Sequence, residues 1–294
     1  MVESGRSAAE RRHLRRELGC LGAVAVLHGA DSVGVKLTRA EYVFELHGDI
    51  ASATAVMRRA LEDSTSSADQ AFAHYVGELA FNAGNPSAAL AENEAGLQAD
   101  PGYAALRQGK ARAEVALGVT DAAVRDYATV VSEVPQPQYL VEFGELLASL
   151  GRDQEAQAQY AVFGTEVALF QANGVTLDTD PTLFYAYHGD PAKALAFGEA
   201  GLKIRPLIEM EDAYAWALHV NGRDGEALAR ERQAMQLGTR NALFFFHAGM
   251  IERALGQNAA ATASLKQALA SNPHFSPYQE PVLRQALTEL GGTP

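Results

Sequence analysis

Seven glycines recur along this 294-residue chain at nearly constant spacing, and this repeat constrains the fold more than any other feature of the sequence. Their separations are 36, 34, 33, 38, 33 and 34 residues, and they are Gly48, Gly84, Gly118, Gly151, Gly189, Gly222 and Gly256. Five residues after each glycine stands an alanine: Ala53, Ala89, Ala123, Ala156, Ala194, Ala227 and Ala261. The segments 84–101 and 189–206 share ten of their eighteen residues. The chain is therefore predicted to be an array of copies of one structural unit.

Each unit is predicted to be a helix, a tight turn and a second helix. Glycine suits the left-handed residue that ends the first helix, because it has no side chain to crowd the backbone. A residue type that favours helix N-caps follows within two positions in every unit, at Asp49, Asn85, Thr120, Asp153, Asp190, Asp224 and Asn258. The alanine then lies about one turn into the second helix, where its small side chain lets the two helices approach closely. Four units end in a proline that stops the second helix, at Pro101, Pro135, Pro206 and Pro273.

These features together resemble the tetratricopeptide repeat (TPR), which also has an aromatic residue nine positions after the glycine, as at Tyr127 and Tyr160 here. The resemblance covers about residues 34–273. It implies an all-α fold, an α-α superhelix (right-handed solenoid) of about seven helical hairpins with a concave groove. The chain departs from the TPR pattern at the aromatic position of the other five units, which have Met57, Asn93, Gly198, Glu231 and Leu265. A generic helical bundle would not explain the fixed period.

The repeat divides the chain into three parts. Residues 1–33 match no unit, and could be a cap, a flexible basic arm or an upstream extension. Residues 34–273 form the array. Residues 274–294 are predicted to be a capping helix and tail, because apolar side chains recur at helical spacing, at Phe275, Tyr278, Val282, Leu283, Ala286, Leu287 and Leu290.

One unit is longer than the others, with 38 residues between Gly151 and Gly189. The surplus is placed in residues 171–180, where Asn173-Gly174 is a turn signal. Residues 172–180 are therefore predicted to be the longest internal loop. Such a loop could be a tolerated insertion, since added loop length costs little free energy, or it could overhang the groove.

The charge distribution excludes one class of partner. Residues 1–39 contain seven Lys and Arg against four Asp and Glu, whereas the other residues contain 17 against 32. An acidic body repels a phosphate backbone, so we expect no binding to nucleic acid. Cys20 is the only cysteine, which rules out an internal disulfide. No segment reaches the roughly 18 apolar residues of a membrane span, and we expect a cytoplasmic protein of bacterial type, or an exported one if the true N-terminus lies upstream.

The sequence shows no motif for catalysis or for cofactor binding. Phosphate loops, nucleophile elbows and dinucleotide fingerprints are absent from it. The pair His74 and Glu78 has the spacing of two metal ligands on one helix face, but two ligands do not make a site. We therefore expect no enzyme activity, no catalytic residue, no cofactor and no metal.

The groove of the superhelix is where the resemblance places function, because the first helix of each TPR hairpin lines it at ten, six and three residues before the glycine. At those positions, with Tyr187 beside them, the candidate partner-binding residues are Tyr42, Glu45, His74, Glu78, Phe81, Arg112, Glu145, Asp212, Trp216, His219, Phe246, Met250 and Arg253. The set mixes aromatic residues with carboxylates and lacks the Lys and Asn clamp of TPR proteins that bind a terminal carboxylate. A basic or apolar partner is therefore expected.

The aromatic end of this set has two interpretations. Trp216, Phe246, Met250 and Tyr187 could anchor an apolar side chain of a partner. They could instead be core residues, if the register of the array differs slightly from the predicted one.

Three classes of function remain for such a chain. The first is an adaptor or scaffold that binds a peptide or helix of a partner protein in its concave groove. The alternative is a peptide-sensing regulatory protein whose superhelix closes on a small ligand peptide. An enzyme built on helical repeats is disfavoured, because no acid, base or metal set converges in the sequence.

Overall fold

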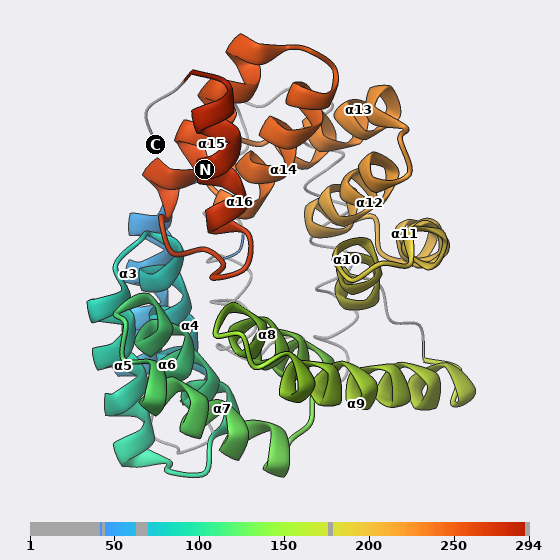
Figure 1. The fold of residues 1–294 in the computed structure, drawn as a ribbon. Helices are drawn as coiled ribbons and strands as arrows, with labels where there is room; N and C mark the ends of the chain where they lie inside the picture. The colour runs from blue at the N-terminus through green and yellow to red at the C-terminus, as the bar shows by residue number, and fades with distance from the viewer. Residues whose placement is uncertain (1–41, 43–44, 63–69, 176–178, 292–294) are drawn as a thin grey trace.

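The fold is described by a computed structural model that covers residues 42, 45–62, 70–175 and 179–291. All regular structure in these ranges is α-helical (Figure 1). The helices are α3 Ile50–Glu62, α4 Gln70–Asn82, α5 Pro86–Ala99, α6 Ala104–Ala116, α7 Thr120–Glu133, α8 Pro137–Ser149, α9 Asp153–Ala172, α10 Thr179–Tyr187, α11 Pro191–Ile204, α12 Ile208–Val220, α13 Asp224–Ala234, α14 Ala242–Ala254, α15 Asn258–Ser271 and α16 Glu280–Glu289. Residues 1–33, whose role the sequence leaves open, lie outside the described residues.

The predicted helical hairpins are confirmed. Every one of the seven turn glycines has a φ between +70° and +96°, the left-handed region that glycine adopts without strain. Each except Gly48 stands between two of the helices named above, and Gly48 follows the helical residues Glu45 and Leu46. The chain is therefore an all-α superhelix of seven TPR-like hairpins, followed by α16.

The predicted close approach at the alanines is confirmed as well. All seven alanines are at most 1 % exposed. Four residues further on, the position that is aromatic in only two units is buried in all seven, whatever its residue type. In three hairpins its side chain packs against a glycine of the first helix: Asn93 against Gly77, Tyr160 against Gly144 and Leu265 against Gly249. A Cβ atom on Gly144 would lie 2.2 Å from Cε1 of Tyr160, and one on Gly249 would lie 2.6 Å from Cγ of Leu265. In these hairpins a larger side chain on the second helix is thus matched by a glycine on the first.

The helix caps were predicted correctly in three units only. The side chains of Asp49, Asn85 and Asp190 each accept a hydrogen bond at 3.1 Å from the amide three residues later. The prediction is wrong for Thr120, Asp153, Asp224 and Asn258, which are the first residues of their helices. The cap positions there are Val119, Arg152, Arg223 and Gln257, and none makes a side-chain cap. These units have one more residue between the glycine and the polar side chain.

The prediction of a long loop at residues 172–180 is wrong. The surplus residues lengthen α9, which has 20 residues where α5, α7, α11 and α15 have 14 each. The α9–α10 connection is therefore residues 173–178, one residue shorter than the α13–α14 connection at 235–241. Figure 1 shows the end of α9 extending outward from the array.

The C-terminal helix begins later than predicted. Residues 272–279, here called the strap, are not helical, and α16 starts at Glu280. Pro277 disfavours helix at the residue before it, whereas Pro281 lies in the first turn of α16, where proline is tolerated. Phe275 and Tyr278 therefore belong to the strap, while Leu283, Ala286 and Leu287 form the buried face of α16.

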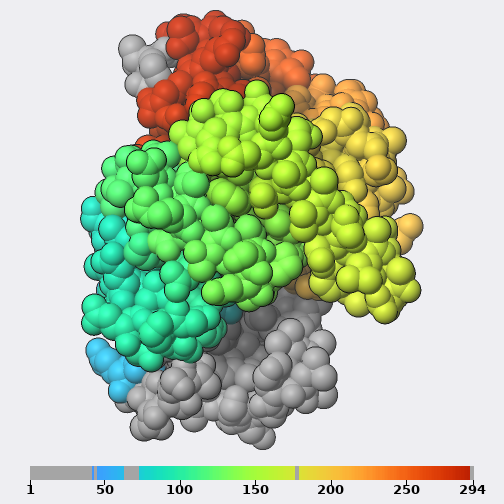
Figure 2. All heavy atoms as spheres, turned by 60° about the horizontal axis from the view of Figure 1, so that its bottom comes forward, coloured from blue at the N-terminus to red at the C-terminus, as the bar shows by residue number. Residues whose placement is uncertain are grey.

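The array closes on itself. Leu46 of the first hairpin packs in one buried cluster with Ile208, Leu237 and Phe244 of the last units. Nδ1 of His47 lies 3.1 Å from the carbonyl oxygen of Leu237. Figure 1 shows the C-terminal helices beside α3, at the start of the array. Figure 2 shows the intervening units packed in chain order around the outside. We refer to these contacts as the closing contact.

No helix in the described part of the chain is long and apolar enough to cross a membrane.

The buried alanines give a direct test of the packing. Ala194 is 0 % exposed, whereas Ala192 on the same helix is exposed. Ala194→Leu is expected to lower the free energy of unfolding by about 1–3 kcal/mol, because the added carbons must fit where two helices touch. Ala192→Leu should change it by less than about 0.5 kcal/mol. Equal urea midpoints for the two variants would contradict this packing.

The closing contact predicts a dependence of stability on pH. The hydroxyl of Tyr42 donates to Oε2 of Glu209 at 3.5 Å. Burial, together with the nearby carboxylates of Glu45 and Asp212, raises the pKa of Glu209 from 4.5 to about 7. Between these two pH values the folded state keeps a proton that the unfolded state has released, so the free energy of unfolding falls as the pH rises through this window.

Glu209→Gln removes this titration. Urea unfolding at about pH 5 and about pH 7.5 should therefore show a larger loss of stability for the wild type than for this variant. The exposed Glu94→Gln is the matched control and should behave as the wild type. Parallel losses in the wild type and Glu209→Gln would show that Glu209 does not titrate in this range.

Candidate functional site

Three adjoining cavities lie inside the closed array, and together they form what we call the groove. All three share Arg112 and Phe275. Their walls come from the first helices of several hairpins, mainly α4, α6, α8, α10 and α14, and from the strap. The superhelix therefore places side chains from distant units around one space.

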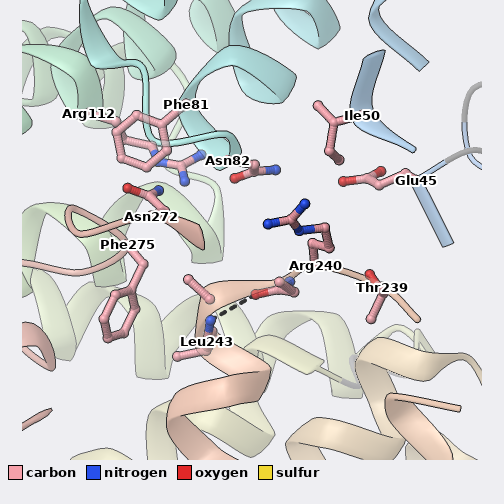
Figure 3. A pocket seen from close by; sticks show the side chains of 12 residues that line it. Glu45, Ile50, Phe81, Asn82, Arg112, Thr239, Arg240, Leu243, Asn272 and Phe275 are labelled. Atoms are coloured by element: carbon pink, nitrogen blue, oxygen red, sulfur yellow. Dashed lines mark hydrogen bonds between the residues drawn. The ribbon is translucent and has the colours of Figure 1, made fainter. Parts of the chain in front are cut away.

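The first cavity lies at the closing contact, between the first hairpins and the last ones (Figure 3). Glu45 and Ile50 form one side of it, and the α13–α14 connection forms the other. Figure 3 shows the guanidinium of Arg240 pointing into the space from that connection. A ligand here would contact both ends of the array.

Arg112 is the electrostatic centre of the groove. Its Nη1 donates to Oε2 of Glu78 at 2.5 Å, and its guanidinium lies 4.3 Å from the centre of the Phe81 ring. Burial alone would lower the pKa of Arg112, but the carboxylates of Glu78 and Glu142 outweigh it and hold the pKa above its usual range. In return Arg112 lowers the pKa of Glu78 in spite of burial. The guanidinium of Arg112 is thus hydrogen-bonded to one carboxylate, Glu78, and attracted by a second, Glu142.

The largest of the three cavities is rich in carboxylates. It has a volume of about 280 Å³ and is lined by Glu142, Glu145 and Asp180. Apolar side chains complete its wall, including Leu183, Phe184, Leu243 and Phe275. Burial raises the pKa of Glu145, and a hydrogen bond from His188, with Nε2 and Oε1 3.4 Å apart, offsets part of that rise. A polar rim and an apolar wall are thus combined in one cavity.

The strap runs across the inner face of the array. Phe275 contributes to every one of the three cavities and packs 5.7 Å from the ring of Phe246. Tyr278 lies with its ring centre 5.5 Å from that of His188. The chain's own C-terminal segment thus fills part of the concave side.

Five of the residues predicted for the groove line the three cavities: Glu45, Phe81, Arg112, Glu145 and Tyr187. Others lie close by with structural contacts. Glu78 pairs with Arg112, and Oδ1 of Asp224 lies 2.6 Å from Nδ1 of His219. Tyr42 belongs to the closing contact. His74 is close enough to Glu78 for its charge to help lower the pKa of that carboxylate. Arg253 pairs with Glu289 of α16, and Met250 packs against the C-terminal core.

The interpretation of Trp216, Phe246 and Asp212 as groove surface is wrong in this structure. They are 6 %, 0 % and 1 % exposed. The two rings do meet, with centres 5.6 Å apart, but they do so inside the C-terminal core. Trp216 contacts the rings of Tyr187 on α10 and His247 on α14, and Phe246 contacts Phe275 of the strap, so neighbouring helices and the strap cover these positions. For Trp216 and Phe246 the second interpretation, that they are core residues, holds.

Sequence reasoning missed Glu142 and the strap. Glu142 stands nine residues before its glycine, about 60° around the helix from the position six before it, so a wider stripe would have included it. No local signal placed Phe275 in the groove, because that position depends on how the whole array curves.

Comparison with known proteins adds a likeness in shape alone. No family model matches the chain, and no curated protein matches it. A tetratricopeptide repeat protein from Parabacteroides merdae is similar in structure at 17 % identity and a TM-score of 0.48, over 87 % of this chain and 98 % of that one. The APC/C hetero-tetramer Cut9–Hcn1 is similar at 16 % identity and a TM-score of 0.48, over 94 % of this chain and 53 % of that one.

PilW, a type IV pilus biogenesis factor, gives 20 % identity and a TM-score of 0.42, over 72 % of this chain and 98 % of that one. Because each TM-score is below 0.5, the fold rests on the chain's own repeat and hairpin geometry.

The Arg112–Glu78 pair can be tested by a double-mutant cycle. Arg112→Met is expected to lower the free energy of unfolding by about 1–3 kcal/mol, because it leaves Glu78 and Glu142 without their cation. Adding Glu78→Gln should restore part of that loss. Strictly additive effects in urea unfolding would mean that the two side chains do not interact.

Proposed function

We propose that this chain is a protein-interaction module, an adaptor or scaffold, that binds a segment of a partner protein in its groove. The segment carries a Lys or Arg next to an apolar side chain. The observation that carries the proposal is the cavity in which Glu142, Glu145 and Asp180 face an apolar wall. We assign the chain no reaction, since its sequence contains no motif for one.

The charges of this cavity favour a basic group. Its lining includes three carboxylates, and the one cation among its lining residues, Arg112, already pairs with Glu78. The carboxylate of Glu142 accepts hydrogen bonds from the amide of Gln108 at 2.5 Å and from the hydroxyl of Tyr127 at 3.1 Å, which fix its position. Glu145 has a longer bond to His188, which an incoming ammonium or guanidinium group could replace. Complementary charge of this kind steers association and sets specificity.

The size of the cavity favours an anchor rather than a complete ligand. A volume of about 280 Å³ is slightly below that of small-molecule sites, roughly 300–1,000 Å³, so the space suits one large side chain. Leu183, Phe184, Leu243 and Phe275 would surround it. The rest of the segment would lie along the strap. Buried apolar anchors supply most of the affinity in such interfaces.

A second candidate function, a sensor that closes on a small peptide, is favoured by the closing contact. The cavity between Glu45 and Arg240 has walls from both ends of the array. A ligand that touches both ends binds the closed form more tightly than an open one and therefore shifts the population toward closure.

The proposal predicts which peptides the protein selects. A display library of random peptides panned on the purified wild type should yield sequences with Lys or Arg beside an aromatic or long aliphatic residue. The double variant Glu145→Gln with Asp180→Asn should bind those peptides about tenfold more weakly, with a smaller dependence on salt. Glu94→Gln, on the exposed face of α5, is the control and should bind as the wild type.

Selected peptides that lack a basic residue, or that bind the double variant as tightly as the wild type, would contradict the proposed site. Equal affinity in Phe275→Ala would exclude the strap from the site. Radius of gyration with and without a selected peptide separates the two candidates, because only the sensor requires an open population in the free protein that the peptide converts to the compact closed form.

A further inference from the structure

A cluster of ionisable side chains is buried in the C-terminal core, behind Tyr187, which lines the largest cavity. Asp212 of α12, Glu231 of α13 and His247 of α14 are 1 %, 1 % and 0 % exposed. One carboxylate oxygen from each acid and one imidazole nitrogen all lie within 4.8 Å of one another. Three consecutive helices thus converge on one polar point.

The histidine of the cluster is held on both sides. Nδ1 of His247 lies 2.7 Å from Oδ1 of Asp212, and its Nε2 contacts the hydroxyl of Tyr187 on α10. Trp216 stacks on the ring, with centres 4.4 Å apart. These contacts fix the ring with Nδ1 directed at the carboxylates.

Glu231 is the member that internal contacts do not explain. No N–H group donates to either carboxylate oxygen of Glu231, although the side chain is buried, and the polar group close enough to share a proton with it is the carboxylate of Asp212. The charged groups that act on it are themselves carboxylates, those of Asp212 and Glu252. Burying a carboxylate without a donor or a cation is costly. The equivalent position in the other six units has an uncharged residue, so hairpin packing does not require an acid there.

We propose that Asp212, Glu231 and His247 bind one divalent transition-metal ion, with Zn²⁺ as the best match. One neutral imidazole and two carboxylates are ordinary zinc ligands, and with Glu231 bidentate through its two oxygens they supply the four donor atoms of a closed site. The charge of the ion would cancel the two negative charges. Tyr187, on the other nitrogen of the ring, takes the orienting place that second partners of metal-bound histidines occupy. Since the site is buried, the ion has a structural role and enters as the chain folds.

The site would support the groove indirectly. Helices α12 and α14 also carry Ile208 and Phe244, against which Leu46 packs at the closing contact. An ion that joins α12, α13 and α14 would hold these surfaces in place, so binding of the ion and closure of the array would stabilise each other.

The test uses the full chain and zinc ion alone as the probe. The protein is unfolded in a denaturant that contains a chelator. It is then refolded with or without Zn²⁺, and excess ion is removed. The wild type is expected to retain about one zinc per chain by elemental analysis and to show a higher Tm than the zinc-free sample. With Co²⁺ in place of zinc, a visible absorption band should report nitrogen and oxygen ligands.

Two variants decide the outcome. Glu231→Gln removes one charged ligand with little change of shape and is expected to lose the bound ion, the absorption band and the zinc-dependent rise in Tm. Glu226→Gln, on the exposed face of the same helix, should retain all three. A folded wild type that retains no zinc would overturn the proposal and indicate a proton shared between Asp212 and Glu231. Equal metal content in Glu231→Gln and the wild type would also overturn it. These results are independent of peptide binding, so they leave the proposed function untouched.

Discussion

The packing of the first hairpin against the last two is the interaction on which the interior of this protein depends. Leu46 enters a cluster with Ile208, Leu237 and Phe244, and a Cβ atom on Gly48 would lie 2.6 Å from the carbonyl oxygen of Gly238. Without this contact the array would be an open superhelix, with a concave side that faces solvent. With it, the groove becomes a bounded space, and carboxylates of α8 and α10 face apolar side chains of α14 and the strap.

The parts of the fold that depend on neighbouring residues could be predicted from the sequence. Turn glycines and the alanines five residues later act within one hairpin, and both behave as predicted. Even here, a shift of one residue matters: a polar side chain directly after the glycine caps the next helix, as at Asn85, whereas one placed a residue later, as at Asp153, does not. The surplus residues after the turn glycine of the fourth hairpin, Gly151, could form a loop or lengthen the helix, and the local pattern did not separate these.

The site could be predicted only in part, because it depends on how the seven hairpins are arranged relative to one another. Glu145 and Arg112, each six residues before its glycine, both line the largest cavity. Trp216 occupies the same position in its unit, yet curvature buries it. The cluster around Glu231 has no motif, because its members lie 19 and 16 residues apart on three helices. Glu231 differs from the other units at a position that is otherwise uncharged, and that difference was the available signal.

Closure of the array can be measured directly by pulsed electron–electron spin resonance. Spin labels would replace the exposed residues Ala55 on α3 and Gln236 in the α13–α14 connection, in a background with Cys20→Ser. We expect one short, narrow distance distribution, which should broaden when Leu46→Ala weakens the closing contact. A broad distribution at long distances in the unmodified array would show that the superhelix is open in solution, and the bounded groove would then not exist.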